Sequence, residues 1–144
     1  MSELFPNRAA ARLHEQAAVW HRPEYLASEA ADQLTDDFVR EDRRRLVGVP
    51  GLVDGPTFIE QQWAWLELGH GPHSFHVDEV IGQRSDRWVV VRLRIAFEDD
   101  YAVEVLVVWQ YDKAVVRLER MIVFDADDVD SALSELDRLS GGIA

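Results

Sequence analysis

The sequence predicts one α+β domain in which a curved antiparallel sheet packs against helices and encloses a small apolar pocket. Three observations support this prediction. The first half of the chain carries apolar residues at helical spacing, the second half carries long apolar–polar alternations, and short polar turns separate these alternating runs. A length of 144 residues is typical of a single domain, so residues 1–144 are expected to fold as one unit.

Three helices are expected in the first half of the chain, and the first carries apolar residues at spacings of three and four. This face consists of Phe5, Ala9, Leu13, Ala17 and Trp20. Pro23 suits the first turn of a second helix, and a third helix is expected over residues 57–68. The apolar stripe of the third helix consists of Phe58, Ile59, Gln62, Trp63 and Leu66.

Alternation with a period of two predicts the strands. The expected strands cover residues 38–47, 75–83, 88–98, 101–111 and 114–125. Short polar connections between the last four strands predict an antiparallel meander. In the final strand the alternation places Leu118, Arg120 and Ile122 on one face, and a short C-terminal helix is expected to start near Asp128.

Composition excludes several classes of function. A net charge of −12 would repel a phosphate backbone, so nucleic acid is not an expected partner. No apolar run is long enough to span a bilayer, and charged residues interrupt the segment Met1 to Ala18, unlike a signal peptide. The chain has no Cys, which excludes disulfides and thiolate sites. A cytoplasmic protein without a membrane partner is therefore expected.

Two stretches carry a resemblance to a known family. The first is LTDDFVRED, residues 34–42, followed by a turn, Asp54-Gly55 and the third predicted helix; the second is the tail over residues 123–137. Together they resemble the SnoaL-like and ketosteroid-isomerase-like proteins of the nuclear transport factor two superfamily. The resemblance implies a cone-shaped sheet with a pocket open at one end, and a homodimer formed through the outer face of the sheet. It does not imply a reaction, because one fold hosts many functions.

By this resemblance, Asp42 takes the position of the general base in ketosteroid isomerases. A partly desolvated carboxylate there would remove a proton next to a carbonyl group. Arg40 and Arg44 share the strand face of Asp42, and nearby cations lower the pKa of a carboxyl group and make it a weaker base. Two interpretations stay open: Asp42 is a catalytic base, or it belongs to an ion-pair network at the pocket.

The remaining catalytic groups of the family are not matched. The resemblance places Val107 where the isomerases have a protonated Asp, and the first predicted helix contains no Tyr. Ile122 falls near the last catalytic Asp of limonene epoxide hydrolases and of SnoaL-type cyclases. The sequence therefore does not predict any of these three activities.

Arg120 and His14 are the candidate polar partners of Asp42. Arg120 lies between Leu118 and Ile122 on an apolar strand face, where an Arg is rare unless it is paired. It would bind a ligand carboxylate or enolate, or form an ion pair with Asp42 or with an acidic residue from a helix. His14 is a candidate on the first helix, although a helix histidine commonly has a structural role.

Aromatic residues at strand and helix positions would line a pocket and stack on a flat ligand, or simply fill the core. Trp63 matches a pocket aromatic of the isomerases. The residues expected to line the pocket are Trp63, Tyr101, Val107, Trp109, Leu118 and Ile122.

No cofactor or metal is expected. His70, His73 and His76 lie close together, and zinc binds imidazoles, but no carboxylate precedes Asp78 in this segment and a solvated loop fits it better. The sequence contains no phosphate-binding glycine loop and no dinucleotide-binding motif.

Two hypotheses of function follow, both with a small apolar or aromatic ligand. The first is a cofactor-independent acid/base enzyme of the isomerase, cyclase or dehydratase type, with Asp42 as base and Arg120 or His14 as its partner. The second is a non-catalytic ligand-binding or regulatory module in which the same pocket only holds the molecule.

Overall fold

The structure is a computed structural model that describes residues 6–45, 51–67, 72–97 and 101–142. It confirms the α+β class. The helices are α1 (Arg8–Ala17), α2 (Pro23–Ser28), the 3₁₀ turn η1 (Ala31–Gln33), α3 (Gly55–Glu67) and α4 (Val129–Ser140). The strands are β1 (Leu34–Asp42), β2 (Leu52–Asp54), β3 (Ser74–Arg84), β4 (Trp88–Ala96), β5 (Ala102–Tyr111) and β6 (Leu118–Asp125).

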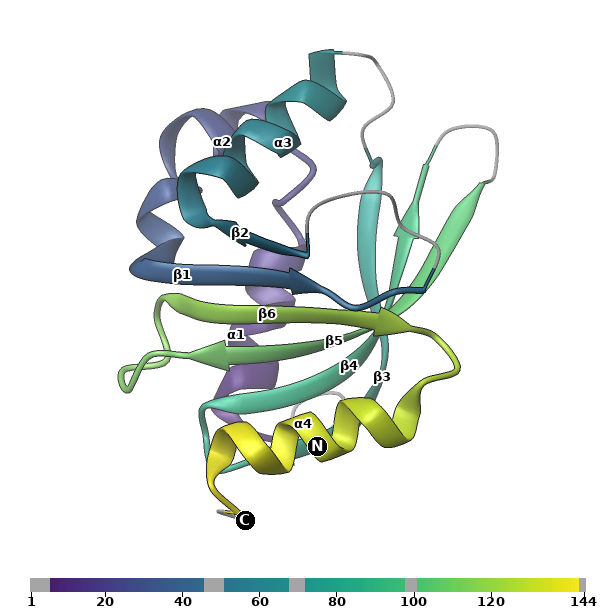
Figure 1. Ribbon diagram of the computed structural model, residues 1–144. Coiled ribbons are helices and arrows are strands. Elements are labelled where there is room, and N and C mark those ends of the chain that lie inside the picture. The colour runs from purple at the N-terminus through teal and green to yellow at the C-terminus, as the bar shows by residue number, and fades with distance from the viewer. Residues whose placement is uncertain (1–5, 46–50, 68–71, 98–100, 143–144) are drawn as a thin grey trace.

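The six strands form one open, strongly curved sheet with the order β2-β1-β6-β5-β4-β3 (Figure 1). The meander from β3 to β6 is antiparallel, as the alternating sequence predicts. The sheet as a whole is mixed rather than wholly antiparallel, because β1 runs parallel to β6. The short strand β2 is an additional element that pairs with β1 before α3 begins.

Helices cover both faces of the sheet. Helix α1 packs behind β3, β4 and β5, whereas α4 crosses the opposite face of the same strands (Figure 1). Two separate apolar cores result: one joins α1 to the inner face, and the other joins α4 to the outer face. None of the helices in the described segments is long and apolar enough to cross a bilayer.

Helix α1 is fixed at its start by Asn7. The Asn7 side chain accepts a hydrogen bond from the backbone N–H of Ala10 at 2.9 Å, which caps the helix. The same side chain donates to the carbonyl oxygens of Ser85 and Trp88, both at 3.0 Å. The helix start is therefore tied to the turn between β3 and β4, which holds α1 over the inner face.

An extra residue in β6 reverses the orientation of the side chains along this strand. Tyr111 pairs with Leu118, whereas the preceding residue of β5, Gln110, pairs with Arg120. Glu119 is therefore a bulge residue without a partner of its own. Beyond the bulge, Met121 takes the inner face and Ile122 the outer face.

Helix α4 lies close to the outer face of β3. A Cβ atom at Gly82 would come within 3.0 Å of Leu133 Cδ2, so glycine permits this approach. Leu136 is fully buried between α4 and the sheet. Its apolar contacts hold the C-terminal helix in place.

We expect Leu136→Ala to lower the free energy of unfolding by about 2–5 kcal/mol, because it removes buried methyl groups and leaves a void. Denaturant-induced unfolding followed by fluorescence measures the change. Ser134→Ala is the matched control on the exposed side of the same helix, and we expect a change below about 0.5 kcal/mol. Equal effects of the two substitutions would show that α4 is not held by this core.

Candidate functional site

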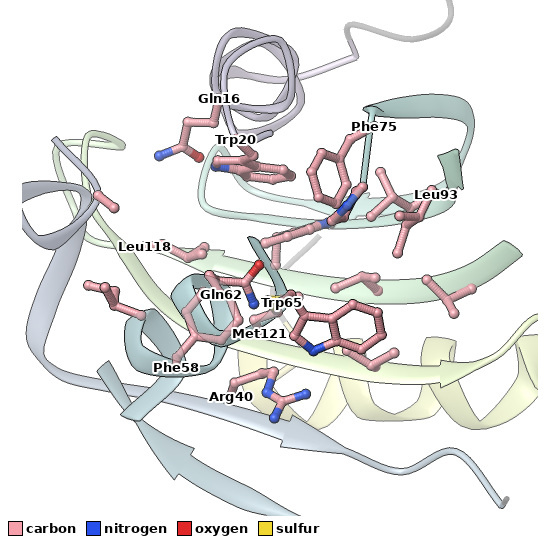
Figure 2. Close-up of a pocket in the computed structure, with 18 of the residues that line it drawn as sticks. Gln16, Trp20, Arg40, Phe58, Gln62, Trp65, Phe75, Leu93, Leu118 and Met121 are labelled. Atoms are coloured by element: carbon pink, nitrogen blue, oxygen red, sulfur yellow. The ribbon is translucent and has the colours of Figure 1, made fainter. Parts of the chain in front are cut away.

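A cavity of about 640 Å³ lies between the inner face of the sheet and the helices α2 and α3 (Figure 2). This volume is typical of sites for small organic molecules. The wall is mostly apolar and aromatic. The sheet contributes Leu93, Ile95, Val103, Val105, Val107, Trp109, Leu118, Met121 and Val123. Phe75 of β3 also belongs to the wall, and its helical and loop residues include Trp20, Tyr25, Leu26, Phe58, Ile59, Gln62 and Trp65.

Three aromatic side chains pack together in one part of this wall. Trp20 stacks on Trp109, with ring centroids 5.1 Å apart and planes inclined by 26°. Phe75 meets Trp20 edge to face at 5.5 Å. Figure 2 shows Trp20 and Phe75 on the same side of the cavity. Such packed rings offer a rigid surface for a flat apolar ligand.

The cavity opens to solvent beside a second aromatic group. Trp65 and Tyr101 line the cavity and are 49% and 61% exposed, so they mark its mouth. Phe97 connects them, with its ring centroid 6.0 Å from that of Trp65 and 5.6 Å from that of Tyr101. A ligand would therefore enter past aromatic rings at the ends of α3, β4 and β5.

A charged cluster of three residues lies at the β1 side of the cavity. Arg40 and Arg44 line the wall, and Asp42 lies behind them with a side chain that is only 1% exposed. Arg44 donates three hydrogen bonds of at most 3.1 Å to Asp42, from its backbone N–H to Oδ1 (3.1 Å), from Nε to Oδ1 (3.0 Å) and from Nη2 to Oδ2 (2.6 Å). Arg40 Nη1 lies 3.5 Å from Asp42 Oδ2.

The electrostatics of this cluster keep all three groups charged. Burial raises the pKa of Asp42, but the hydrogen bonds from Arg44 and the charges of Arg44 and Arg40 outweigh burial, and the net pKa is lowered. The hydrogen bond to Asp42 raises the pKa of Arg44. Burial lowers the pKa of Arg40, which still remains a cation because arginine does not lose its proton in proteins.

A second polar group, which includes the wall residues Gln16 and Gln33, is internally satisfied. Tyr111 is fully buried, and its hydroxyl donates to Gln16 Oε1 at 2.6 Å. Gln16 Nε2 donates to Gln33 Oε1 at 3.2 Å, and Arg12 donates to the same oxygen. Burial raises the pKa of Tyr111, so this residue stays a neutral donor. These bonds tie α1 to β5 and to η1.

Comparison with known proteins identifies the fold. No protein-family model and no curated protein matches the chain. Among solved structures, PrhC from Penicillium brasilianum NBRC 6234 matches with a TM-score of 0.62 and 11% identity over 94% of this chain and 91% of that one. A LEH-like epoxide hydrolase of M. tuberculosis matches with a TM-score of 0.58 and 16% identity over 93% and 96%.

One of the similar solved structures is a designed protein that is named for its fold. The de novo designed NTF2-fold protein NT-9 matches with a TM-score of 0.52 and 12% identity over 94% of this chain and 95% of that one. The chain has the nuclear transport factor two-like fold. At these identities the likeness concerns the fold alone, so the function depends on the residues of the site.

The nuclear transport factor two-like fold of this chain brings four of the predicted pocket residues to the cavity wall. These are Tyr101, Val107, Trp109 and Leu118. Trp63 does not line the cavity, because the inward stripe of α3 runs through Phe58, Gln62 and Trp65. Ile122 lies in the outer core against α4, because the bulge at Glu119 reverses the strand beyond Leu118.

The three predicted catalytic residues do not meet at the cavity. Asp42 is covered by Arg40 and Arg44 and is not part of the wall. Arg120 faces the same side of β6 as Ile122, and its side chain makes no ion pair or hydrogen bond with the described residues. His14 lies on α1, half-buried and outside the cavity wall.

The histidine-rich segment shows no metal site in the part of the chain that the structure describes. His70 lies outside the described residues. His76 Nε2 is 2.8 Å from the Ser74 hydroxyl on β3. No three His, Cys, Asp or Glu side chains in the described segments gather as metal ligands.

The sequence placed Arg40 and Arg44 in a possible ion-pair network with Asp42 at the pocket, but it did not predict that both arginines line the cavity wall. The alternation along β1 places both on one face with Phe38, and Phe38 belongs to the inner core. This signal was present in the sequence. Trp65 and Met121 were also missed, and they depend on the phase of α3 and on the bulge in β6.

The lowered pKa of Asp42 predicts a specific dependence of stability on pH. The ionised carboxylate stabilises the folded protein at any pH above its ordinary pKa of 3.8, and this contribution is lost as the pH falls through the lowered folded-state pKa. We expect Asp42→Asn to lower the free energy of unfolding by about 3 kcal/mol at pH 7, because the buried Arg40 and the half-buried Arg44 lose their anionic partner. This difference should shrink below pH 3.8.

Denaturant-induced unfolding of wild type and variant between pH 3 and pH 7 measures this difference. Asp36→Asn is the matched control, since Asp36 is exposed on the same strand and makes no ion pair with the described residues. We expect a change below about 0.5 kcal/mol for the control. A difference between wild type and Asp42→Asn that does not vary with pH would contradict the assigned role of the carboxylate.

Proposed function

We propose that the protein binds a small apolar or aromatic molecule in the cavity and does not convert it by acid/base chemistry. One observation carries this proposal: the cavity of about 640 Å³ has an apolar wall, and none of the described residues in that wall is a carboxylate or an imidazole. A large apolar volume with few polar groups is the common form of a small-molecule site. Of the two hypotheses from the sequence, the geometry favours the binding module.

The enzyme hypothesis lacks a base that reaches the ligand. A general base must come within hydrogen-bonding distance of the proton that it removes. Asp42 accepts its hydrogen bonds from Arg44, is 1% exposed and has a lowered pKa. A structurally similar protein is an epoxide hydrolase, but at 16% identity that likeness carries no reaction to this chain.

Binding of a neutral aromatic probe tests the proposal. N-phenyl-1-naphthylamine fluoresces strongly in apolar surroundings, and we expect wild type to bind it with a micromolar dissociation constant. Ile95→Trp should weaken this binding at least tenfold, because Ile95 lines the cavity and a larger side chain would fill it. Arg94→Trp is the matched control on the opposite face of β4 and should bind as wild type does.

Two outcomes would contradict this proposal. The first is an absence of probe binding to the folded wild-type protein. The second concerns catalysis: a screen of hydrophobic metabolites by mass spectrometry should reveal binding without conversion. A compound that is converted by wild type but not by Asp42→Asn would make the protein an enzyme with Asp42 as its working carboxylate.

The homodimer and the cytoplasmic location stay predictions. Helix α4 covers the apolar part of the outer sheet face, where Leu106, Val108 and Phe124 are buried in the chain itself. The remaining part of that face carries ion pairs, such as Arg92–Glu79 at 3.2 Å. A dimer through the outer face would therefore have a polar interface, unlike the apolar interfaces of obligate dimers.

Light scattering at micromolar concentration measures the oligomeric state. We expect twice the mass of one chain, and a dimer that dissociates in high salt because its interface is charged. The mass of a single chain at low salt would contradict the homodimer. That result would mean that α4 occupies the part of the sheet where a second copy would otherwise pack.

A further inference from the structure

We propose that the ligand of this cavity is an organic anion: an apolar or aromatic molecule with one carboxylate or similar acid group, which binds to Arg40 and Arg44. This inference rests on the proposed function, because it names the chemical class of ligand for the same cavity. The charged residues of the cavity wall support it.

The charged residues in the described cavity wall are both cations. Arg40 and Arg44 share one carboxylate, Asp42, so one positive charge is left without a partner. Asp125 also acts on Arg44, but it forms an ion pair with Arg45 at 3.3 Å. This excess positive charge lies in a chain with a net charge of −12. The positive site is therefore local, and the overall charge of the protein does not produce it.

Arg40 is the cation whose bonding is incomplete. The residue is 9% exposed, and it donates from Nη2 to Gln61 Oε1 at 3.0 Å. Its only anionic neighbour in the described residues, Asp42, is 3.5 Å away, and Arg40 Nε has no hydrogen-bond partner there. A buried guanidinium whose positive charge is only partly compensated is unfavourable unless another anion is bound.

The hydrogen bonds of Asp42 explain why Arg40 in particular remains available. Arg44 takes both carboxylate oxygens, with bonds of 3.0 Å to Oδ1 and 2.6 Å to Oδ2. Arg40 therefore interacts with Asp42 mainly through charge. Its guanidinium also lies over the Phe58 ring, 5.8 Å from the centroid, which holds it beside the apolar wall.

A second unpaired donor lies on the same face of the sheet. Trp109 is 1% exposed, lines the cavity, and its Nε1 has no hydrogen-bond partner in the described residues. Met121 pairs with Arg40 on one side and with Trp109 on the other. Arg40 and Trp109 therefore lie on the two strands that flank β6, and their Cα atoms are roughly 10 Å apart.

The shape of the cavity agrees with a ligand that has one acidic end. Figure 2 shows Arg40 on the side opposite Trp20 and Phe75, so the guanidinium and the packed rings lie at different parts of the wall. An apolar body would contact the rings while the acid group meets the arginines. Hydrogen bonds between a guanidinium and a carboxylate are about twice as strong as neutral ones, and this favours an acid over a neutral analogue.

Displacement of N-phenyl-1-naphthylamine tests the inference with a matched pair of competitors. 4-Biphenylcarboxylate and its methyl ester share one apolar body and differ in charge. At pH 7 we expect the carboxylate to displace the probe from wild type at a concentration at least tenfold lower than the ester. This preference should fall below threefold in Arg40→Leu.

Arg120→Leu is the matched control. Arg120 lies beside Met121 on β6 but does not line the cavity. The Arg120→Leu variant should keep the full preference for the carboxylate. This control separates the effect of removing one positive charge from the protein from the effect of removing the Arg40 guanidinium. Binding of the neutral probe by Arg40→Leu, with an affinity close to that of wild type, shows that the cavity of the variant is intact.

The outcomes separate this inference from the proposed function. Equal displacement by acid and ester in wild type would overturn the inference, whereas binding of the probe would still support the proposed function. A preference that survives in Arg40→Leu but disappears in Arg120→Leu would also overturn it. A wild-type protein that binds neither the probe nor the competitors would overturn both. If Arg40→Leu does not fold, Arg40→Gln replaces it, and the carboxylate should lose its preference there as well.

Discussion

The buried carboxylate of Asp42 holds the polar side of this cavity together. A carboxylate that is 1% exposed costs several kcal/mol to bury unless its oxygens accept hydrogen bonds from cations. Arg44 supplies these bonds from both its backbone and its side chain, and Arg40 adds its charge. The same contacts direct both guanidiniums to the cavity wall. They also occupy the oxygen atoms that a general base would need, so the arrangement that positions the arginines reduces the basicity of Asp42.

The elements of the fold could be predicted from the sequence to a large extent, because they depend on local patterns. Alternation over residues 88–96 and 102–111 leaves one face apolar enough to be buried, and this fixes both strands and their antiparallel pairing. The bulge at Glu119 could not be predicted in the same way. Glu119 and Arg120 are two consecutive polar residues that interrupt the alternation, and the four apolar residues after them fit either face, so the orientation beyond Leu118 depends on the pairing, which skips one residue. Ile122 was therefore expected in the pocket and lies against α4.

The inward stripe of α3 was predicted only in part: Phe58, Ile59 and Gln62 line the cavity as expected, but Trp65 lies there in place of Trp63. Trp63 and Trp65 lie about 200° apart around a helix, so only one of them can face inward. Each of the two Trp residues would extend an apolar stripe of this helix. Which of them faces the cavity depends on how α3 packs on β1 and β2. The parallel pairing of β1 with β6 is a similar case, because it joins segments about 80 residues apart in the chain. Local patterns carry no information about such a pairing.

The polar atoms that face the cavity determine which chemistry it offers. Acid/base catalysis in an apolar pocket requires an acceptor that takes a proton and a donor that stabilises the charge formed. The two cations among the described wall residues, Arg40 and Arg44, share one carboxylate, and none of the described wall residues is itself a carboxylate or an imidazole. The acceptors of Gln16 and Gln33 are already bonded to Tyr111 and Arg12. A wall that carries excess positive charge and no general base attracts an anion and cannot remove a proton from a ligand, which is the property of a binding site for an anion.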